Sequence, residues 1–293
     1  MRLSTSTNIY FNRPDGSKAS IEDSMKRCAA AGYRVMDMNF HDCTTFRLPF
    51  VGDAHESWIN GIAELAATLN LEFSQAHAPF YNFCDDNFTD RERMDRLILR
   101  AIDHAAVLRI PWVVIHAGTD FKAAKRIAAS KEKNLAYFLP LVEYAAKRGV
   151  GIAVENLWDL NISPLRRYTT EVEELMDFVE AFPKEIVGVC YDVGHGTIMG
   201  QDHRLNLQLM GDRLKATHVS DCFNIDSDHM LPYTGKTDWN CVMQALREIS
   251  YQGDFTYEIH RYTATMPDAL VQQALAHSVA VGEHLINLSM EEL

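Results

Sequence analysis

The feature that most constrains the fold of this chain is a short strand-like segment that recurs eight times, with starts 27 to 41 residues apart. The eight segments cover 3–11, 33–40, 71–78, 112–118, 151–157, 187–194, 214–221 and 254–261. Helical patterns follow them, over 19–31, 55–70, 90–108, 131–149, 170–181, 201–212, 238–250 and 267–287. Connections of this length join parallel strands, and eight strand–helix units are the number that closes a barrel. The sequence therefore predicts an α/β protein, a (β/α)8 TIM barrel.

The length and composition of the chain predict a single domain. With 293 residues, 47% of them hydrophobic, the chain is long enough to bury a sizeable core. No stretch rich in proline, glycine and serine divides it, so we expect one domain over residues 1–293. An open, doubly wound sheet is the structural alternative. That fold favours a glycine-rich phosphate loop after an early strand, and the sequence contains no G-x-G-x-x-G motif.

The charge balance narrows the class of partner. The chain carries 28 basic and 40 acidic residues, and its formal net charge of -12 disfavours nucleic acid and anionic membranes. Its first residues lack the pattern of a secretory signal, and no apolar run approaches the ~20 residues that span a bilayer. Six scattered cysteines without a C-x-x-C pair favour reduced thiols. We therefore expect a cytoplasmic protein, and leave open whether it is a homo-oligomer.

Alternation within the predicted strands indicates which side chains face the barrel interior. In segment 151–157, Gly151, Ala153 and Glu155 share one face, whereas Ile152 and Val154 share the other. The small residues suit the inside of a barrel, and the bulky residues suit the layer beneath the helices. Later strands repeat the pattern. The inner face therefore ends in a polar residue at the C-terminal mouth, where the active sites of this fold lie.

Histidines and carboxylates gather at these predicted strand ends. One of them marks the end of each of the last six strands: His77, His116, Glu155, Asp192, His218 and Glu258. His195 and His229 follow the sixth and seventh strands at a short distance. Without partners, so many polar groups in one place carry a high desolvation cost. A divalent cation removes that cost, because imidazole and carboxylate together suit Zn²⁺, Mn²⁺ or Fe²⁺.

An ordered set of short motifs follows strands three to eight and spans about two-thirds of the chain. The motifs are QAHAPF (75–80), VVIHAG (113–118), VENLW (154–158), YDVGH (191–195), HVSD (218–221), HMLPYTGKTDW (229–239) and YEIH (257–260). Each motif is weak alone, but as an ordered set they are specific. The set resembles the xylose isomerase-like TIM barrels, the superfamily of sugar phosphate isomerases and epimerases and of the endonuclease IV type of AP endonuclease (AP endonuclease family 2).

The resemblance implies a metal centre. In the epimerase branch one ion, often Mn²⁺, is held by the equivalents of Glu155, Asp192, His218 and Glu258. In the endonuclease branch a second ion uses the equivalents of His77, His116 and Glu155. A third ion there uses those of His195 and His229 with an aspartate at the position of Ser227, whereas this chain has its acids at Asp226 and Asp228. We expect one divalent cation, Mn²⁺ or Zn²⁺. Whether the four outer histidines bind a second ion or the substrate stays open.

The resemblance also implies a reaction on a small carbohydrate. A metal-stabilised enediolate would form while Glu155 and Glu258, on opposite sides of the substrate, remove and return the proton. Trp158 would pack on an apolar ring face, and Tyr233, in place of a family glycine, would reshape the substrate pocket. This predicts an isomerase or epimerase of a sugar, sugar phosphate or polyol-derived ketone. The alternatives are phosphodiester hydrolysis of the endonuclease IV type and dehydration of a polyol or keto-inositol.

Overall fold

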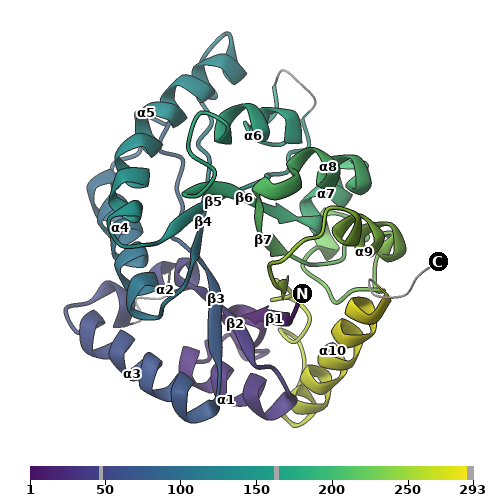
Figure 1. The fold of residues 1–293 in the computed structure, drawn as a ribbon. Coiled ribbons are helices and arrows are strands. Elements are labelled where there is room, and N and C mark those ends of the chain that lie inside the picture. Colours follow the sequence, from purple (N-terminus) through teal and green to yellow (C-terminus); the bar gives the residue numbers. More distant parts are fainter. Residues whose placement is uncertain (46–48, 162–164, 289–293) are drawn as a thin grey trace.

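Eight parallel strands form the centre of the molecule, and helices surround them (Figure 1). The computed structural model describes residues 1–45, 49–161 and 165–288. The strands are β1 (Leu3–Ser6), β2 (Val35–Asn39), β3 (Glu72–His77), β4 (Trp112–His116), β5 (Gly151–Glu155), β6 (Val187–Asp192), β7 (Leu214–His218) and β8 (Phe255–Tyr257). Neighbours in the sheet follow the order of the chain, and β8 pairs with β1. The predicted (β/α)8 TIM barrel is confirmed.

Helices occupy all the predicted positions between the strands. They are α1 (Ile21–Ala31), α3 (His55–Leu69), α4 (Arg91–Val107), α5 (Arg126–Ala146), α6 (Val172–Val179), α8 (His203–Met210), α9 (Trp239–Glu248) and α10 (Asp268–Leu288). Two further helices, α2 (Phe40–Thr45) and α7 (Val193–Met199), start directly after β2 and β6 and lie outside the prediction. The two glycines of α7 lower its helix propensity, so this helix depends on its cap and its packing.

All eight strands end earlier than predicted, by one to five residues, and the first and the last are shortened most. The strand expected over 3–11 stops at Ser6, because Ser6 Oγ accepts the N–H of Asn8 at 3.4 Å and the chain turns into the 3₁₀ helix η1 (Thr7–Tyr10). The strand expected over 254–261 stops at Tyr257. Glu258 therefore lies just past the end of β8 rather than within it.

The joint between β7 and β8 has little main-chain pairing. In the part of the chain that the structure describes, β8 pairs in register with β1, whereas one isolated bridge, between Val219 and Tyr257, connects it to the β7 side. Around this bridge the N–H of Val219 donates to the carbonyl of Thr256 at 2.7 Å, and the N–H of Glu258 donates to Val219 O at 3.0 Å. The barrel is thus nearly closed, and the bridge places Glu258 beside the end of β7.

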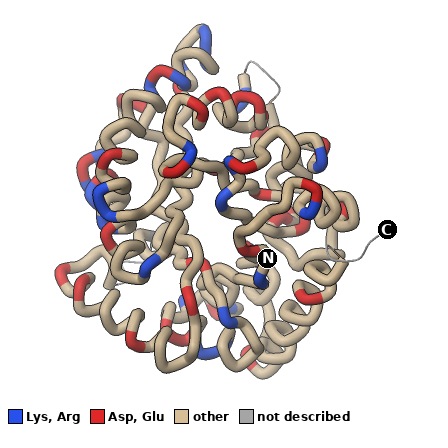
Figure 2. The backbone as a smooth tube through the Cα atoms, in the orientation of Figure 1, with Lys and Arg blue, Asp and Glu red and all other residues tan. Residues whose placement is uncertain are grey.

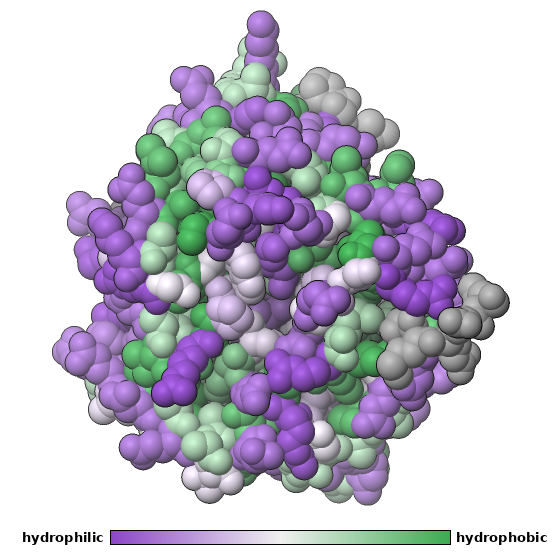
Figure 3. Space-filling view, viewed as in Figure 1, coloured by the Kyte–Doolittle hydropathy of each residue, from purple (hydrophilic) through white to green (hydrophobic). Residues whose placement is uncertain are grey.

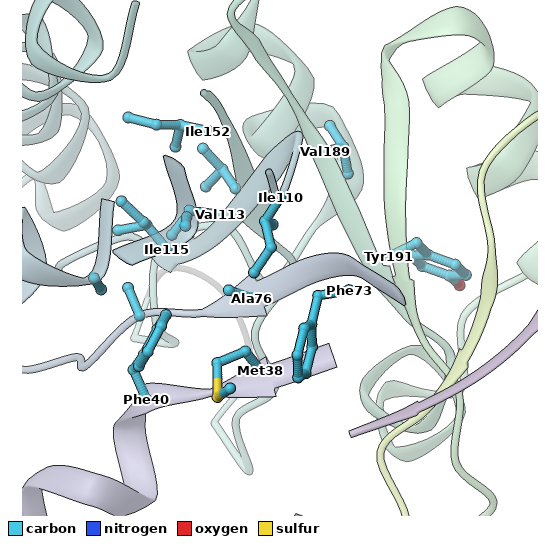
Figure 4. Close-up of a cluster of buried hydrophobic side chains, with 14 of the residues drawn as sticks. Met38, Phe40, Phe73, Ala76, Ile110, Val113, Ile115, Ile152, Val189 and Tyr191 are labelled. Carbon is cyan, nitrogen blue, oxygen red and sulfur yellow. The ribbon is translucent and has the colours of Figure 1, made fainter. Parts of the chain in front are cut away.

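The two faces of the strands form two separate cores, as the alternation predicts. Bulky residues such as Ile152 and Val189 pack in the layer between strands and helices (Figure 4). Inside the barrel lies a second, small cluster of buried residues: Val114, Ala153, Cys190 and Ala216. The small inner side chains leave room for polar groups closer to the mouth.

The surface carries both signs of charge. Acidic and basic segments alternate around the periphery of the face in Figure 2, so the acidic excess is not gathered in one patch there. Figure 3 shows hydrophilic side chains over most of the same face, with smaller hydrophobic areas between them. Among the helices of the described residues, none combines the length and the hydropathy that a membrane crossing needs.

Candidate active site

Glu155, at the end of β5, is the centre of a buried cluster of imidazoles. Its Oε2 lies 3.1 Å from His116 Nε2, 3.4 Å from His77 Nε2 and 3.3 Å from His218 Nδ1. His116 is its register neighbour on β4, so the sheet itself brings this pair together. The Nδ1 of His77 is hydrogen-bonded to Ala78 O at 2.8 Å, and this bond leaves its Nε2 lone pair directed at His116 and Glu155.

His218, at the end of β7, lies between the two glutamates. Its Nδ1 is 3.3 Å from Glu155 Oε2 and 3.4 Å from Glu258 Oε2, and within the described residues this buried nitrogen has no hydrogen-bond partner. Its Nε2 lies 3.3 Å from Oδ2 of Asp37, which is fully buried on β2. A proton on Nε2 satisfies Asp37 and leaves the Nδ1 lone pair free, as in the carboxylate–histidine pairs that support metal ligands.

The two carboxylate oxygens of Asp192 have different surroundings. Its Oδ1 accepts the N–H of His195 at 2.8 Å and so caps α7, while its buried Oδ2 has no hydrogen-bond partner among the described residues. Asp192 is the register neighbour of His218, so this free oxygen lies at the same end of the barrel. A Cβ at Gly194 would collide with Ser220 Oγ and lie 3.2 Å from Asp192 Oδ1, so a larger residue could enter this cap only if Ser220 moved.

His229 approaches the cluster from the loop after β7. Its Nε2 lies 3.7 Å from Glu258 Oε2, and its Nδ1 lies 3.1 Å from Asp228 Oδ2. Asp228 also pairs with Arg261 at 2.9 Å, whereas Asp226 is exposed. Of the two acids that the sequence analysis singled out in this loop, Asp228 is therefore the one at the site.

The buried charges shift one another's pKa. Burial alone would raise the pKa of Glu155 and of Glu258, but the histidines around them, His218 foremost, hold both well below the ordinary value. Burial would lower the pKa of His218, yet the surrounding negative charges raise it well above its ordinary value. Burial likewise opposes the charged form of His229, but Asp228 and Glu258 raise its pKa to about 10. The ionised glutamates thus favour a positive charge beside them, either a proton on His218 and His229 or a bound cation.

The donor atoms fit a divalent cation. Several triplets place one ligand atom of each residue within 4.8 Å of the others: His77, His116 and Glu155; His77, His218 and Glu258; Asp192, His195 and His229. Asp192 Oδ2 and His218 Nδ1, which have no hydrogen-bond partner among the described residues, are atoms that could bind such an ion. Carboxylate oxygens and imidazole nitrogens are ligands that Mn²⁺ and Zn²⁺ both accept. His195 also lies at this end of the barrel, and its Nδ1 is hydrogen-bonded to Asn156 O at 2.8 Å.

A cavity of about 390 Å³ opens over the cluster. Glu155, Glu258 and Trp158 line it together with His77, His116, His195 and His229, while Asp192 and His218 are fully buried behind this lining. The guanidinium of Arg167 lies 5.7 Å from the centre of the Trp158 ring. Tyr233 is 53% exposed and lies outside the lining, with its ring 6.1 Å from that of His284.

Sequence reasoning missed several residues at the site. Asp37 lies between two methionines in β2, and an acid at the centre of a strand is the signal that would have found it. His41 and Asp42 line the cavity from α2, the helix outside the prediction. Burial lowers the pKa of His41 to about 3 and raises that of Asp42 to about 6. Cys190 lies beside Glu155 and His218, and burial raises its pKa to about 12, so it remains a thiol.

Comparison with known proteins identifies the family. Residues 25–280 match the family described as xylose isomerase-like TIM barrel. An uncharacterised protein of Sinorhizobium fredii, y4fM, is 28% identical over 283 residues, which cover 94% of this chain and 83% of the relative. A D-tagatose 3-epimerase-like protein superposes with a TM-score of 0.75 at 19% identity, covering 99% of this chain and 100% of the other. The IolI protein, solved with a zinc atom, superposes with a TM-score of 0.78 at 16% identity, covering 98% of each chain. Because the family match extends over most of the sequence, this chain belongs to the xylose isomerase-like TIM barrels.

Proposed function

We propose that this protein is a divalent-metal-dependent isomerase or epimerase of a small sugar, sugar phosphate or polyol-derived ketone. The observation that carries the proposal is the convergence of Glu155 and Glu258, from β5 and from the end of β8, on one nitrogen of His218. Both carboxylates line one cavity, which is the arrangement that proton transfer at a carbon next to a carbonyl needs. The likeness to a D-tagatose 3-epimerase-like protein supports the same reaction class.

We assign Glu155, Asp192, His218 and Glu258 as the residues that hold the cation, as Mn²⁺ or Zn²⁺. Two atoms of this set are buried without hydrogen bonds among the described residues, and two carboxylates of the set are held ionised. When bound, a divalent cation acts as a Lewis acid on the substrate oxygens and offsets the negative charge that develops there. His77 and His116 remain available for a second ion or for a substrate hydroxyl.

Glu155 and Glu258 then act as base and acid. Their low pKa keeps both ionised at neutral pH, so a carboxylate is ready to accept the proton from the carbon next to the carbonyl. His229, protonated because of its raised pKa, lies 3.7 Å from Glu258 Oε2 and holds a proton that Glu258 can pass to the opposite face. If a proton returns to the opposite face of the same carbon, the product is an epimer. If it returns to the neighbouring carbon, the product is an isomer in which the carbonyl has moved.

Deuterium exchange tests the proposal. Ketoses, keto-inositols and their phosphates, incubated in deuterated water with metal-loaded protein, should gain deuterium at a carbon next to the carbonyl. Glu155→Gln and Glu258→Gln should stop this exchange, whereas Glu92→Gln, a matched change at an exposed glutamate, should leave it unchanged. Loss of water from a substrate in the same assay would identify a dehydratase instead. A panel without any exchange rejects the proposed reaction.

Metal-assisted phosphodiester hydrolysis is the second candidate. The compact triplet of His77, His116 and Glu155 favours it, because this chemistry uses more than one ion. Metal analysis of the purified protein narrows the choice: one ion per chain fits the isomerase and three fit the hydrolase, whereas two fit both, because His77 and His116 remain available for a second ion. Incision of DNA that contains an abasic site, without deuterium exchange on sugars, would establish the hydrolase.

A further inference from the structure

We propose that Asp42 and Asn8 form a hydroxyl-binding subsite in the cavity wall, and that the ligand of this wall is an uncharged polyhydroxy chain rather than a sugar phosphate. The inference rests on the proposed function, which it refines by naming the substrate class. Both residues lie outside the metal-ligand set, and both come from the segments that follow β1 and β2.

Asp42 places a carboxylate in the lining of the cavity. It lies in the first turn of α2, where its N–H donates to Asn39 Oδ1 at 2.9 Å, and this bond fixes the start of the helix. Among the described residues, no donor is hydrogen-bonded or ion-paired to its side chain, although it lines the cavity and is partly buried. A carboxylate accepts several hydrogen bonds, so Asp42 can accept them from the hydroxyls of a ligand in the cavity.

Asn8 adds a second acceptor to the same wall. It is only 4% exposed, it lines the cavity, and its Oδ1 is buried without a hydrogen-bond partner in the described chain. An unsatisfied buried acceptor costs free energy that a donor on the ligand recovers. Two acceptors in one cavity wall, neither with a donor among the described residues, favour a ligand with several O–H groups, which a polyhydroxy chain supplies.

The rest of the lining suits the carbon face of a sugar and opposes a phosphate. The rings of Phe80 and Trp158 line the same cavity, and Phe80 is held by stacking on His41 at 3.8 Å between ring centres. The described lining carries four carboxylates, Asp42, Glu155, Asp228 and Glu258, and one guanidinium, Arg167. That guanidinium already faces the Trp158 ring, and its Nε lies 3.9 Å from Asp159. The protonated imidazole of the lining, His229, is paired with Asp228 and Glu258. A phosphate dianion at the wall formed by Asp42 and Asn8 would therefore face more repulsion than attraction.

The experiment compares metal-loaded wild type with Asp42→Ala, Asp42→Asn and Asn8→Ala. Asp53→Ala is the matched control, because Asp53 is exposed and lies outside the cavity lining. Saturation-transfer NMR gives Kd for ketohexoses, for the matching monodeoxy ketohexoses and for ketohexose phosphates. Deuterium exchange gives kcat and KM for the same compounds, and melting temperatures show that each variant is folded.

We expect Asp42→Ala to raise Kd and KM about ten- to hundredfold, the range for a hydrogen bond to a charged group, with kcat less affected. One monodeoxy sugar should bind wild type more weakly by a similar factor, and Asp42→Ala should not distinguish it from the parent. Sugar phosphates should bind wild type more weakly than the parent sugars. The subsite is overturned if removal of the hydroxyl weakens binding equally in wild type and in Asp42→Ala. It is also overturned if sugar phosphates bind wild type more tightly than the parent sugars do. If no sugar exchanges deuterium, the proposed function fails, and the Kd comparison alone then supports or overturns the subsite.

Discussion

Asp221 holds the loop after β7, and removing its charge gives a direct test of how that loop is anchored. Asp221 is fully buried. Its Oδ1 accepts the N–H groups of Cys222 at 2.9 Å and Thr237 at 3.2 Å, and its Oδ2 accepts the indole N–H of Trp239 at 3.1 Å. Its main chain pairs with Met230 at 2.8 and 3.1 Å. The carboxylate therefore joins both ends of the loop that carries the site histidine after β7.

The size of the effect of Asp221→Asn follows from these contacts. All three partners of the side chain are donors and a carboxamide has one acceptor oxygen, so at least one buried donor loses its acceptor. An unsatisfied buried donor costs about 1–3 kcal/mol. For a chain of this length the entropy of unfolding is roughly 0.6 kcal/mol per kelvin, so a cost of about 2 kcal/mol lowers Tm by about 3 °C. Trp239→Phe removes the same hydrogen bond from the other side.

A double-mutant cycle measured by urea unfolding checks this reasoning. In the double variant, Asp221→Asn with Trp239→Phe, the introduced amide no longer faces the indole N–H. The double variant should therefore lose about 1–2 kcal/mol less than the two single changes together, because contacting residues couple. Additivity to within about 0.5 kcal/mol would mean that the hydrogen bond between Asp221 and Trp239 does not hold the loop.

Three further predictions concern the metal, the glutamates and acid. Mn²⁺ or Zn²⁺ at about 100 times Kd should stabilise the protein by about 2.7 kcal/mol, which raises Tm by roughly 4 °C. Asp192→Asn should reduce this rise. If neither ion changes the Tm of metal-free protein, the metal centre is contradicted. Glu155→Gln and Glu258→Gln should each lower kcat about 10²–10⁴-fold without loss of the folded circular dichroism spectrum, and near wild-type kcat in either would remove that residue from the acid–base role. Burial lowers the pKa of His203 to about 4, so its stabilising contribution is complete above pH ~6.5 and is lost as the pH falls towards 4. Tm should fall more steeply across this window in wild type than in His203→Gln, and parallel curves would refute the assignment.

Much of the fold follows from local patterns in the sequence. The recurring strand and helix periods specify the strand–helix units, and the alternation in residues such as Ile152 and Ala153 specifies which side faces the helices. The ends of parallel strands meet at one edge, which predicts that His116, Glu155 and His218 lie close together. In the structure His116 Nε2 lies 3.1 Å and His218 Nδ1 lies 3.3 Å from Glu155 Oε2. This part of the site depends on topology alone.

The remaining parts depend on tertiary contacts that no local pattern contains. Asp37 meets His218 across the barrel, 181 residues away along the chain, so the pair exists only once the barrel has closed. Asp42 faces the cavity because a short helix starts after β2, and α2 has too few residues to show a helical period. Tyr233 adopts a left-handed backbone with φ of 73°, and loop geometry of this kind decides where its side chain points.

The single bridge between Val219 and Tyr257 has a consequence for motion. Strands joined by ladders of several hydrogen bonds separate only when much of the fold opens, whereas a joint with one bridge opens locally at a smaller free-energy cost. Main-chain amides near Tyr257 should therefore exchange their hydrogens sooner than those of β5, which has ladders on both sides. Glu155 lies at the end of β5, whereas Glu258 lies at the joint between β7 and β8. We therefore expect the separation of the two carboxylates to vary more with motion at this joint than with motion elsewhere in the barrel.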